Sequence, residues 1–163
     1  MSGYILIILL IVISLWDIKT FQIPAPFIIV GLLLGLGTSF FTNGSSGLFS
    51  SLFALLIVFI ITFTIWAIGE SFFGASIIGA GDMKLLMVIS TFMGIKLTFL
   101  ILYWSVLLAG FLFLFMIAPK EIFGLFRNVF HFFVYAIPKS NVVTKKIAFS
   151  VPITIATCYF IFF

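Results

Sequence analysis

The chain has 163 residues, of which 64% are hydrophobic and only 7% are charged, and its mean hydropathy is +1.46. Soluble globular domains have about a quarter of their residues charged, so this composition excludes that class and indicates an integral membrane protein. The net charge of +4 is spread along the chain, with no basic run longer than Lys145-Lys146. This pattern argues against nucleic acid as a partner and fits a protein embedded in a lipid bilayer.

Hydropathy predicts an all-α polytopic membrane protein with six transmembrane helices, since each crossing needs about 20 mostly apolar residues. The expected spans cover residues 2–16, 26–41, 48–68, 82–94, 97–118 and 147–163. We expect the first span to be a retained helix, because no positive charge precedes it and no small-residue cleavage site follows it. No internal repeat is visible, so residues 1–163 are predicted to form a single membrane-embedded domain.

The segments between the spans differ in composition. Residues 42–47, Thr-Asn-Gly-Ser-Ser-Gly, predict a tight loop that makes the second and third spans a hairpin, and the glycine-rich residues 70–81 predict a second loop. In residues 122–133, apolar side chains recur at near-helical spacing, which predicts an amphipathic helix in the membrane interface between the fifth and sixth spans. The second span also offers flat patches for helix packing, at Gly31, Gly35 and Gly37.

The basic residues indicate the orientation of the spans. If the short fourth span crosses the membrane, all but one of the basic side chains fall on one side, as the positive-inside rule expects. That side holds Lys19, Lys84, Lys120, Arg127, Lys139, Lys145 and Lys146, and the other side holds Lys96. We therefore expect both termini to lie outside the cytoplasm.

Asp17 and Asp82 stand at the ends of spans, beside apolar runs. A charged group at membrane depth costs roughly 2.5–3.5 kcal/mol at a helix centre, so such residues are by default candidates for a functional site. Asp17 closes a helix that runs inwards, and Asp82 opens a helix that runs outwards, with one hairpin between them. The sequence therefore predicts that both carboxylates lie on the cytoplasmic side at similar depth.

Two neighbouring carboxylates in a poorly hydrated site do not both ionise cheaply, so the pair shares one proton. The ionised member can take a proton from a bound water that attacks a peptide carbonyl, while the protonated member donates to the carbonyl oxygen and then to the leaving amine. Gly79 and Gly81 would let an extended substrate approach the backbone closely. A different interpretation of this Gly-x-Gly-Asp is a glycine-rich turn in which Asp82 only caps the fourth helix.

Such hydrolysis needs no metal, and no cofactor is predicted. The single cysteine, Cys158, and the single histidine, His131, have no partners at metal-ligand spacing. We therefore predict that the protein has no zinc site and no disulfide framework.

Three segments of the chain carry recognisable motifs. Residues 79–86 read Gly-Ala-Gly-Asp-Met-Lys-Leu-Leu, Asp17 is followed downstream by Ile23-Pro24, and residues 146–149 read Lys-Ile-Ala-Phe. Together they resemble three motifs of the type IV prepilin leader peptidases and their preflagellin relatives. Those motifs are Gly-x-Gly-Asp-x-Lys-Leu, an Asp with a later Ile-Pro-Asn, and Lys-Ile-Pro-Phe. Those proteins are polytopic membrane aspartic proteases.

The resemblance implies a membrane aspartic endopeptidase that removes the positively charged leader of pilin-like precursors at the cytoplasmic face of the cell membrane. Asp17 and Asp82 would be its catalytic pair. Ala25 and Ala148 stand where the family often has Asn and Pro, a difference that concerns loop geometry. The long form of the family has a cysteine-bearing insert and N-methylates the mature pilin. This chain lacks the insert and its cysteines, so cleavage without N-methylation is expected.

Two further charged residues are candidates for supporting roles. Lys84 follows Asp82 by two positions, which is roughly the opposite side of a helix, so we interpret it as an interfacial anchor in preference to a catalytic group. Glu70 could receive the basic leader of a substrate or could be solvated in a loop.

Two other functions stay open at this point. An intramembrane protease of the presenilin or signal-peptide-peptidase type shares Gly-x-Gly-Asp, but it has Tyr before its first Asp and a Pro-Ala-Leu near its C-terminus. Here Trp16 precedes Asp17, and no Pro-Ala-Leu occurs. A small ion-coupled or proton-coupled transporter could instead use the two carboxylates to bind its cation. Paired repeats with broken helices would support that function.

Overall fold

The structure is a computed structural model that describes residues 2–73, 79–116 and 148–162. The described helices are α1 (Ser2–Thr20), α2 (Ala25–Phe73), α3 (Ala80–Met116) and α5 (Ser150–Phe162). Of these, α1, α2 and α3 are long and apolar enough to cross a membrane. The prediction of an all-α membrane protein is therefore confirmed, while the interfacial helix predicted for residues 122–133 lies outside the described residues.

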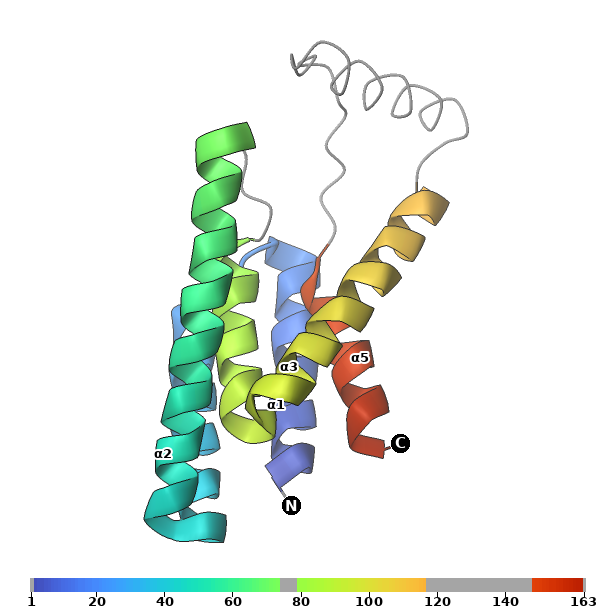
Figure 1. Cartoon of the computed structure of the whole chain (residues 1–163). Helices are drawn as coiled ribbons and strands as arrows, with labels where there is room; N and C mark the ends of the chain where they lie inside the picture. The colour runs from blue at the N-terminus through green and yellow to red at the C-terminus, as the bar shows by residue number, and fades with distance from the viewer. Residues whose placement is uncertain (1, 74–78, 117–147, 163) are drawn as a thin grey trace.

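Two of the helices are each divided by one glycine. In α2, Gly44 has φ 64° and ψ −149°, and in α3, Gly94 has φ 75° and ψ 178°. Glycine adopts positive φ without the penalty that a Cβ brings, and the chain reverses its direction at both places (Figure 1). The predicted end of the fourth span at Gly94 thus coincides with a real break. The predicted loop over residues 42–47 is wrong, because all of them except Gly44 are helical.

Two helices extend further than the sequence predicts. The first ends at Thr20 and not at residue 16, so Asp17 lies within its last turn. Likewise, α2 continues to Phe73 and α3 begins at Ala80, so Glu70 is helical and the loop predicted for residues 70–81 is wrong at both of its ends. A charge ends an apolar run but not a helix, because Lys and Glu are themselves good helix formers.

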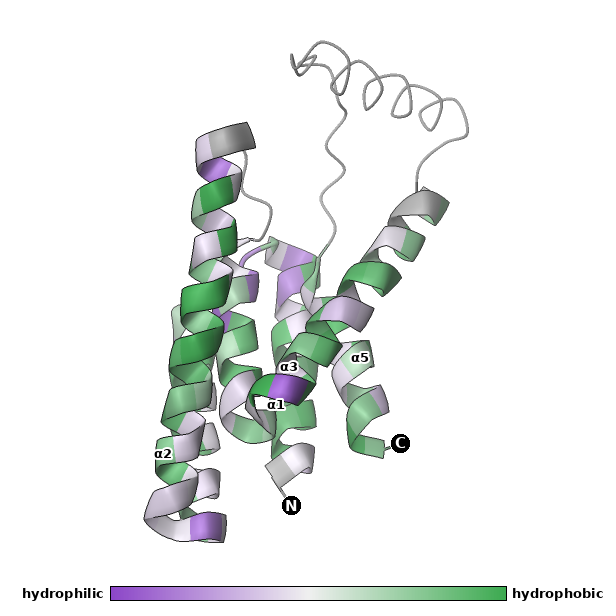
Figure 2. Ribbon diagram, in the orientation of Figure 1, coloured by the Kyte–Doolittle hydropathy of each residue, from purple (hydrophilic) through white to green (hydrophobic). Residues whose placement is uncertain are grey.

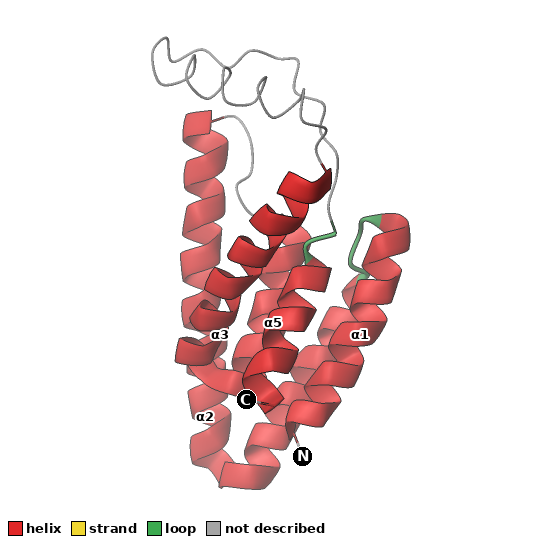
Figure 3. Cartoon of the chain, turned by 90° about the vertical axis from the view of Figure 1, so that its right-hand side faces the viewer, coloured by secondary structure: helices red, strands yellow, loops and turns green. Residues whose placement is uncertain are grey.

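The four helices form a bundle in which α5 packs on both α1 and α3 (Figure 3). The start of α1 and the end of α5 lie at one end of this bundle, and the loop between α1 and α2 lies at the other (Figure 1). Hydrophilic segments gather near that loop, near the turn of α2 and at the break in α3, whereas most of the helical turns between them are hydrophobic (Figure 2). This distribution is that of a bundle whose middle faces lipid and whose ends face water.

The core consists of aliphatic side chains from all four helices. Helix α3 contributes four of them, more than any other helix, and both α2 and α5 pack on it. The buried cluster contains Leu6, Leu10, Ile13, Ile28, Leu85, Val88, Ile89, Ile101, Ile153 and Ala156. In a bilayer, lipid tails are as apolar as these side chains, so helices associate through close packing and interhelical hydrogen bonds.

Small residues allow α2 to approach α3 closely. A Cβ added at Gly31 would lie 2.8 Å from Val88 Cγ1, and a Cβ added at Gly35 would overlap the side chain of Thr91. An added Cβ at Gly37 meets no atom within 4 Å. The predicted packing role is confirmed for the first two glycines and is wrong for Gly37.

A cluster of hydroxyl groups joins both arms of α2 to α3 just before the break in α3. Ser39 Oγ donates a 3.1 Å hydrogen bond to the backbone carbonyl of Thr91. Ser51 Oγ lies 2.6 Å from Ser39 Oγ and 3.0 Å from the same carbonyl. Carbonyls in the last turn before a helix break lack their usual N–H partner, and these two hydroxyls can supply one.

Removing both hydroxyls of this cluster is expected to lower the unfolding free energy by more than the sum of the two single losses. Ser39→Ala or Ser51→Ala alone should lower the unfolding free energy by about 1 kcal/mol, because the remaining hydroxyl still reaches the Thr91 carbonyl. The double variant should lose about 3 kcal/mol, because the carbonyl then has neither hydroxyl. Thermal unfolding in detergent measures the difference, with Ser46→Ala as the control, since Ser46 is exposed and bonds only within α2. Strictly additive losses would contradict the shared role.

Candidate active site

Asp17 lies in the last turn of α1, where α5 covers it. The residue is only 6% exposed, and Ser150 of α5 is fully buried beside it. Ser150 Oγ donates a 2.6 Å hydrogen bond to Asp17 Oδ2. Burying a carboxylate without a partner is costly, so this hydroxyl both compensates the burial and holds the side chain in one orientation.

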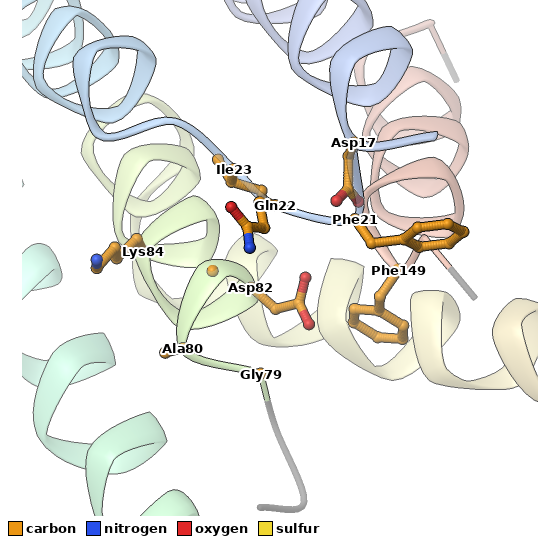
Figure 4. Close-up of a pocket in the computed structure, with 10 residues that line it drawn as sticks. Asp17, Phe21, Gln22, Ile23, Gly79, Ala80, Asp82, Lys84 and Phe149 are labelled. Carbon is orange, nitrogen blue, oxygen red and sulfur yellow. The ribbon is translucent and has the colours of Figure 1, made fainter. Parts of the chain in front are cut away.

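The chain leaves α1 through a left-handed turn at Phe21. Among the described residues, Phe21 is the non-glycine residue with positive φ, at 50°. Its N–H donates to the backbone carbonyl of Asp17 at 2.8 Å, and Thr20 Oγ1 donates to the carbonyl of Gln22 at 3.0 Å. A positive φ at a bulky residue costs free energy. The turn brings Phe21 and Gln22 to the pocket that Asp17 also lines (Figure 4).

Asp82 lies in the first turn of α3. The backbone N–H of Gly79 donates to its carboxylate, and the N–H of Met83 donates to the Gly79 carbonyl at 3.1 Å. A side chain in the first turn that reaches back to the residue before the helix is one half of a capping box. Asp82 therefore does cap α3, as one interpretation of the motif expected, and this bond also fixes where its carboxylate points.

The two aspartates line the same pocket, a cavity of about 500 Å³. Figure 4 shows their carboxylates directed into it from α1 and α3, and the two groups are close enough to interact electrostatically. They are the acidic residues of this pocket, and the rest of its wall is mostly glycine and apolar side chains. The lining residues are Asp17, Phe21, Gln22, Ile23, Gly79, Ala80, Gly81, Asp82, Lys84 and Phe149.

Of the other predicted site residues, three also line this pocket and one does not. Gly79 and Gly81 form its edge at the start of α3. Lys84 lines the pocket but is exposed, and its side chain points away from the two carboxylates (Figure 4). Glu70 lies near the end of α2 and is not among the lining residues.

A comparison with known families gives a match over the part of the chain that holds both aspartates. The family model described as the type IV leader peptidase family matches residues 4–114, which is more than half of the chain. The chain belongs to the type IV leader peptidase family. No curated protein and no solved structure matches the sequence.

Membership of the type IV leader peptidase family makes the protein a protease, in agreement with the resemblance of its motifs. The matched residues contain nearly all of α1, all of α2 and nearly all of α3, and therefore both carboxylates of the pocket. Phe149, which lines the pocket, and Ser150, which bonds Asp17, lie beyond the match.

The titratable side chains that line this pocket are Asp17, Asp82 and Lys84. Within residues 2–73, 79–116 and 148–162, no three His, Cys, Asp or Glu side chains are grouped as metal ligands would be. His131 lies outside the described residues. What the pocket offers is two acidic groups that can exchange protons with a water molecule between them.

Sequence reasoning missed Ser150 and the pocket residues of the turn after α1. A serine in an apolar helix is not distinctive, and Ser150 meets Asp17 only because α5 packs on α1, across 133 positions of the chain. Phe21 and Gln22 follow the predicted span end, where polar and aromatic residues are common. The Lys-Ile-Ala-Phe motif did contain Phe149, but nothing in it indicated that the ring lines the pocket.

A side chain at Gly79 is expected to lower leader-peptidase activity without unfolding the protein. A Cβ there would lie 2.8 Å from Asp82 Oδ2, so Gly79→Ala must displace that carboxylate. We expect kcat to fall roughly 10- to 100-fold, as small displacements of reacting groups do, with an unchanged melting temperature. Gly110→Ala is the matched control, since its added Cβ meets no atom within 4 Å. Normal turnover by Gly79→Ala would exclude a tight placement of Asp82.

Proposed function

We propose that this protein is a membrane aspartic endopeptidase that cleaves the N-terminal leader from type IV pilin-like precursors without N-methylating the product. The observation that carries the proposal is the meeting of Asp17 and Asp82 at one pocket. Membership of the type IV leader peptidase family supports the substrate class. The whole chain, residues 1–163, would act as a single membrane-embedded peptidase domain.

In the proposed mechanism, the two carboxylates share one proton and hold a water molecule between them. The ionised carboxylate takes a proton from the water while the water oxygen attacks the scissile carbonyl carbon. The protonated carboxyl group donates its proton to the carbonyl oxygen. Collapse of the tetrahedral intermediate then breaks the C–N bond, and a carboxyl group protonates the leaving amine. Gly79 and Gly81 offer an edge without side chains along which an extended peptide can lie.

We also propose that the chain crosses the cell membrane six times and that its site faces the cytoplasm. The reversals at Gly44 and Gly94 are compatible with two crossings in each of α2 and α3 (Figure 1). The positive-inside rule puts the Lys19 and Lys84 end, and hence the pocket, on the cytoplasmic side. A leader that is still attached to its precursor can reach the pocket from that side.

Other functions have less support. A presenilin-type protease would also use two aspartates, but the family match is to leader peptidases. A proton-coupled transporter would need a path through the bundle, whereas the pocket is lined by residues of the loop between α1 and α2. That loop lies at one end of the bundle (Figure 1).

The test is cleavage of a purified pilin-like precursor by the purified protein in detergent or liposomes. We expect one cut after the basic leader, and a mature product whose mass carries no added methyl group even when a methyl donor is present. A methylated product would overturn only the claim about methylation. An uncut precursor together with proton or cation flux through proteoliposomes would replace the peptidase by a transporter.

The same assay tests whether the reaction depends on a metal. Because two carboxylates suffice for the proposed mechanism, turnover should be the same with and without EDTA. Activity that is lost in EDTA and restored by zinc would contradict a hydrolysis driven by the carboxylates alone.

A further inference from the structure

We infer that Ser150 is a positioning residue for Asp17, so that the first turn of α5 completes the active site. This inference rests on the proposed function. Ser150 and Asp17 are buried, and Ser150 Oγ donates a 2.6 Å hydrogen bond to Asp17 Oδ2. Asp17 Oδ2 is thereby engaged by α5. Asp17 lines the pocket, and so does Phe149, the residue before Ser150.

The backbone of Ser150 is itself tied to α1, which makes the hydroxyl a fixed donor. The Ser150 carbonyl accepts hydrogen bonds from Ser14 Oγ at 3.2 Å and from Thr154 Oγ1 at 2.9 Å. Ser14 Oγ and Thr154 Oγ1 lie 2.7 Å apart. Ser14 and Asp17 are three positions apart on α1, and Ser150 and Thr154 are four positions apart on α5, so each pair lies on one helix face.

This network distinguishes a positioning role from simple packing. The other buried hydroxyls described above bond to backbone carbonyls or to each other, as Thr157 Oγ1 does to the Ile153 carbonyl. Ser150 instead donates to a carboxylate that faces the pocket. Groups that orient a reacting side chain are what hold it within the narrow range of productive geometry.

The experiment compares Ser150→Ala, Ser150→Thr and Thr157→Val with the wild type in the precursor-cleavage assay, and records the melting temperature of each. Ser150→Ala should lower kcat roughly 10- to 100-fold, as expected for a lost hydrogen bond to a charged group, with KM changed less than about twofold. Ser150→Thr keeps the hydroxyl and should restore most of kcat. Thr157→Val removes an equally buried hydroxyl of α5 and should leave kcat unchanged.

Each outcome has one meaning. If the wild type cleaves the precursor and Ser150→Ala keeps its kcat, the positioning role is wrong while the peptidase stands. If Thr157→Val loses as much kcat as Ser150→Ala, or if kcat follows the melting temperature in all variants, the effect of Ser150 is structural and the inference is overturned. If the wild type cleaves no precursor, the proposed function fails and this inference falls with it.

Discussion

Asp17→Asn and Asp82→Asn are each expected to lower kcat for precursor cleavage by roughly 10³-fold or more, as losses of an essential acid or base do. An amide takes no proton from water and donates none as an acid, so either substitution removes one of the two proton-transfer groups. The substitutions keep the size of the side chain. In Asp17→Asn, the amide oxygen can still accept the hydrogen bond from Ser150, so the fold should persist.

Two further variants make this result specific. The Asp17→Asn and Asp82→Asn double variant should be no slower than the slower single variant, because groups that act as a unit give non-additive losses. Glu70→Gln removes a carboxylate outside the pocket and should keep wild-type kcat, with a raised KM if Glu70 receives the basic leader. Wild-type turnover by either single aspartate variant would refute the aspartyl mechanism.

The pairing of these aspartates could be predicted because charges are rare in this chain. With four acidic residues in 163, a carboxylate at the end of an apolar run is conspicuous, and the alternation of helix directions says which ends lie together. The structure agrees, since both carboxylates line one pocket. The prediction did not require the exact ends of the helices. The first span was expected to end at residue 16, just before Asp17, whereas Asp17 lies inside α1, which continues to Thr20.

Other parts of the site depend on contacts that no local pattern encodes. Ser150 reaches Asp17 through the packing of α5 on α1, and the left-handed turn at Phe21 uses a residue that has no preference for positive φ. The turn at Gly44 was predicted as a loop because Gly, Ser and Asn cluster there, yet a single glycine with positive φ suffices to reverse the helix.

Helix packing sets how these site residues are held, since α3 carries Asp82 and α2 braces α3. The bracing contacts are the approach of Gly31 and Gly35 to α3 and the hydroxyl cluster on the Thr91 carbonyl. All lie on the part of α3 between Asp82 and its break at Gly94. Disturbing them should therefore loosen the half of α3 that begins at the pocket.

The second large effect is expected from Gly35→Leu, which should lower the unfolding free energy by roughly 3 kcal/mol or more, at the upper end of overpacking effects. Even a Cβ at this position would overlap the Thr91 side chain and lie 2.9 Å from Phe92 Cε2. Because the Thr91 Oγ1 hydroxyl bonds its own helix at the Val88 carbonyl, it cannot move aside freely. The two helices must separate.

Gly37→Leu is the matched control for this prediction, because it places the same side chain two positions later, where an added Cβ meets no atom within 4 Å. It should leave stability unchanged or raise it by up to about 1 kcal/mol, since leucine is a better helix former than glycine. Thermal unfolding in detergent measures both variants. Because α3 would shift where it carries Asp82, Gly35→Leu should also lose cleavage activity below its melting temperature. Equal stability of the two variants would mean that α2 does not brace α3 through this face.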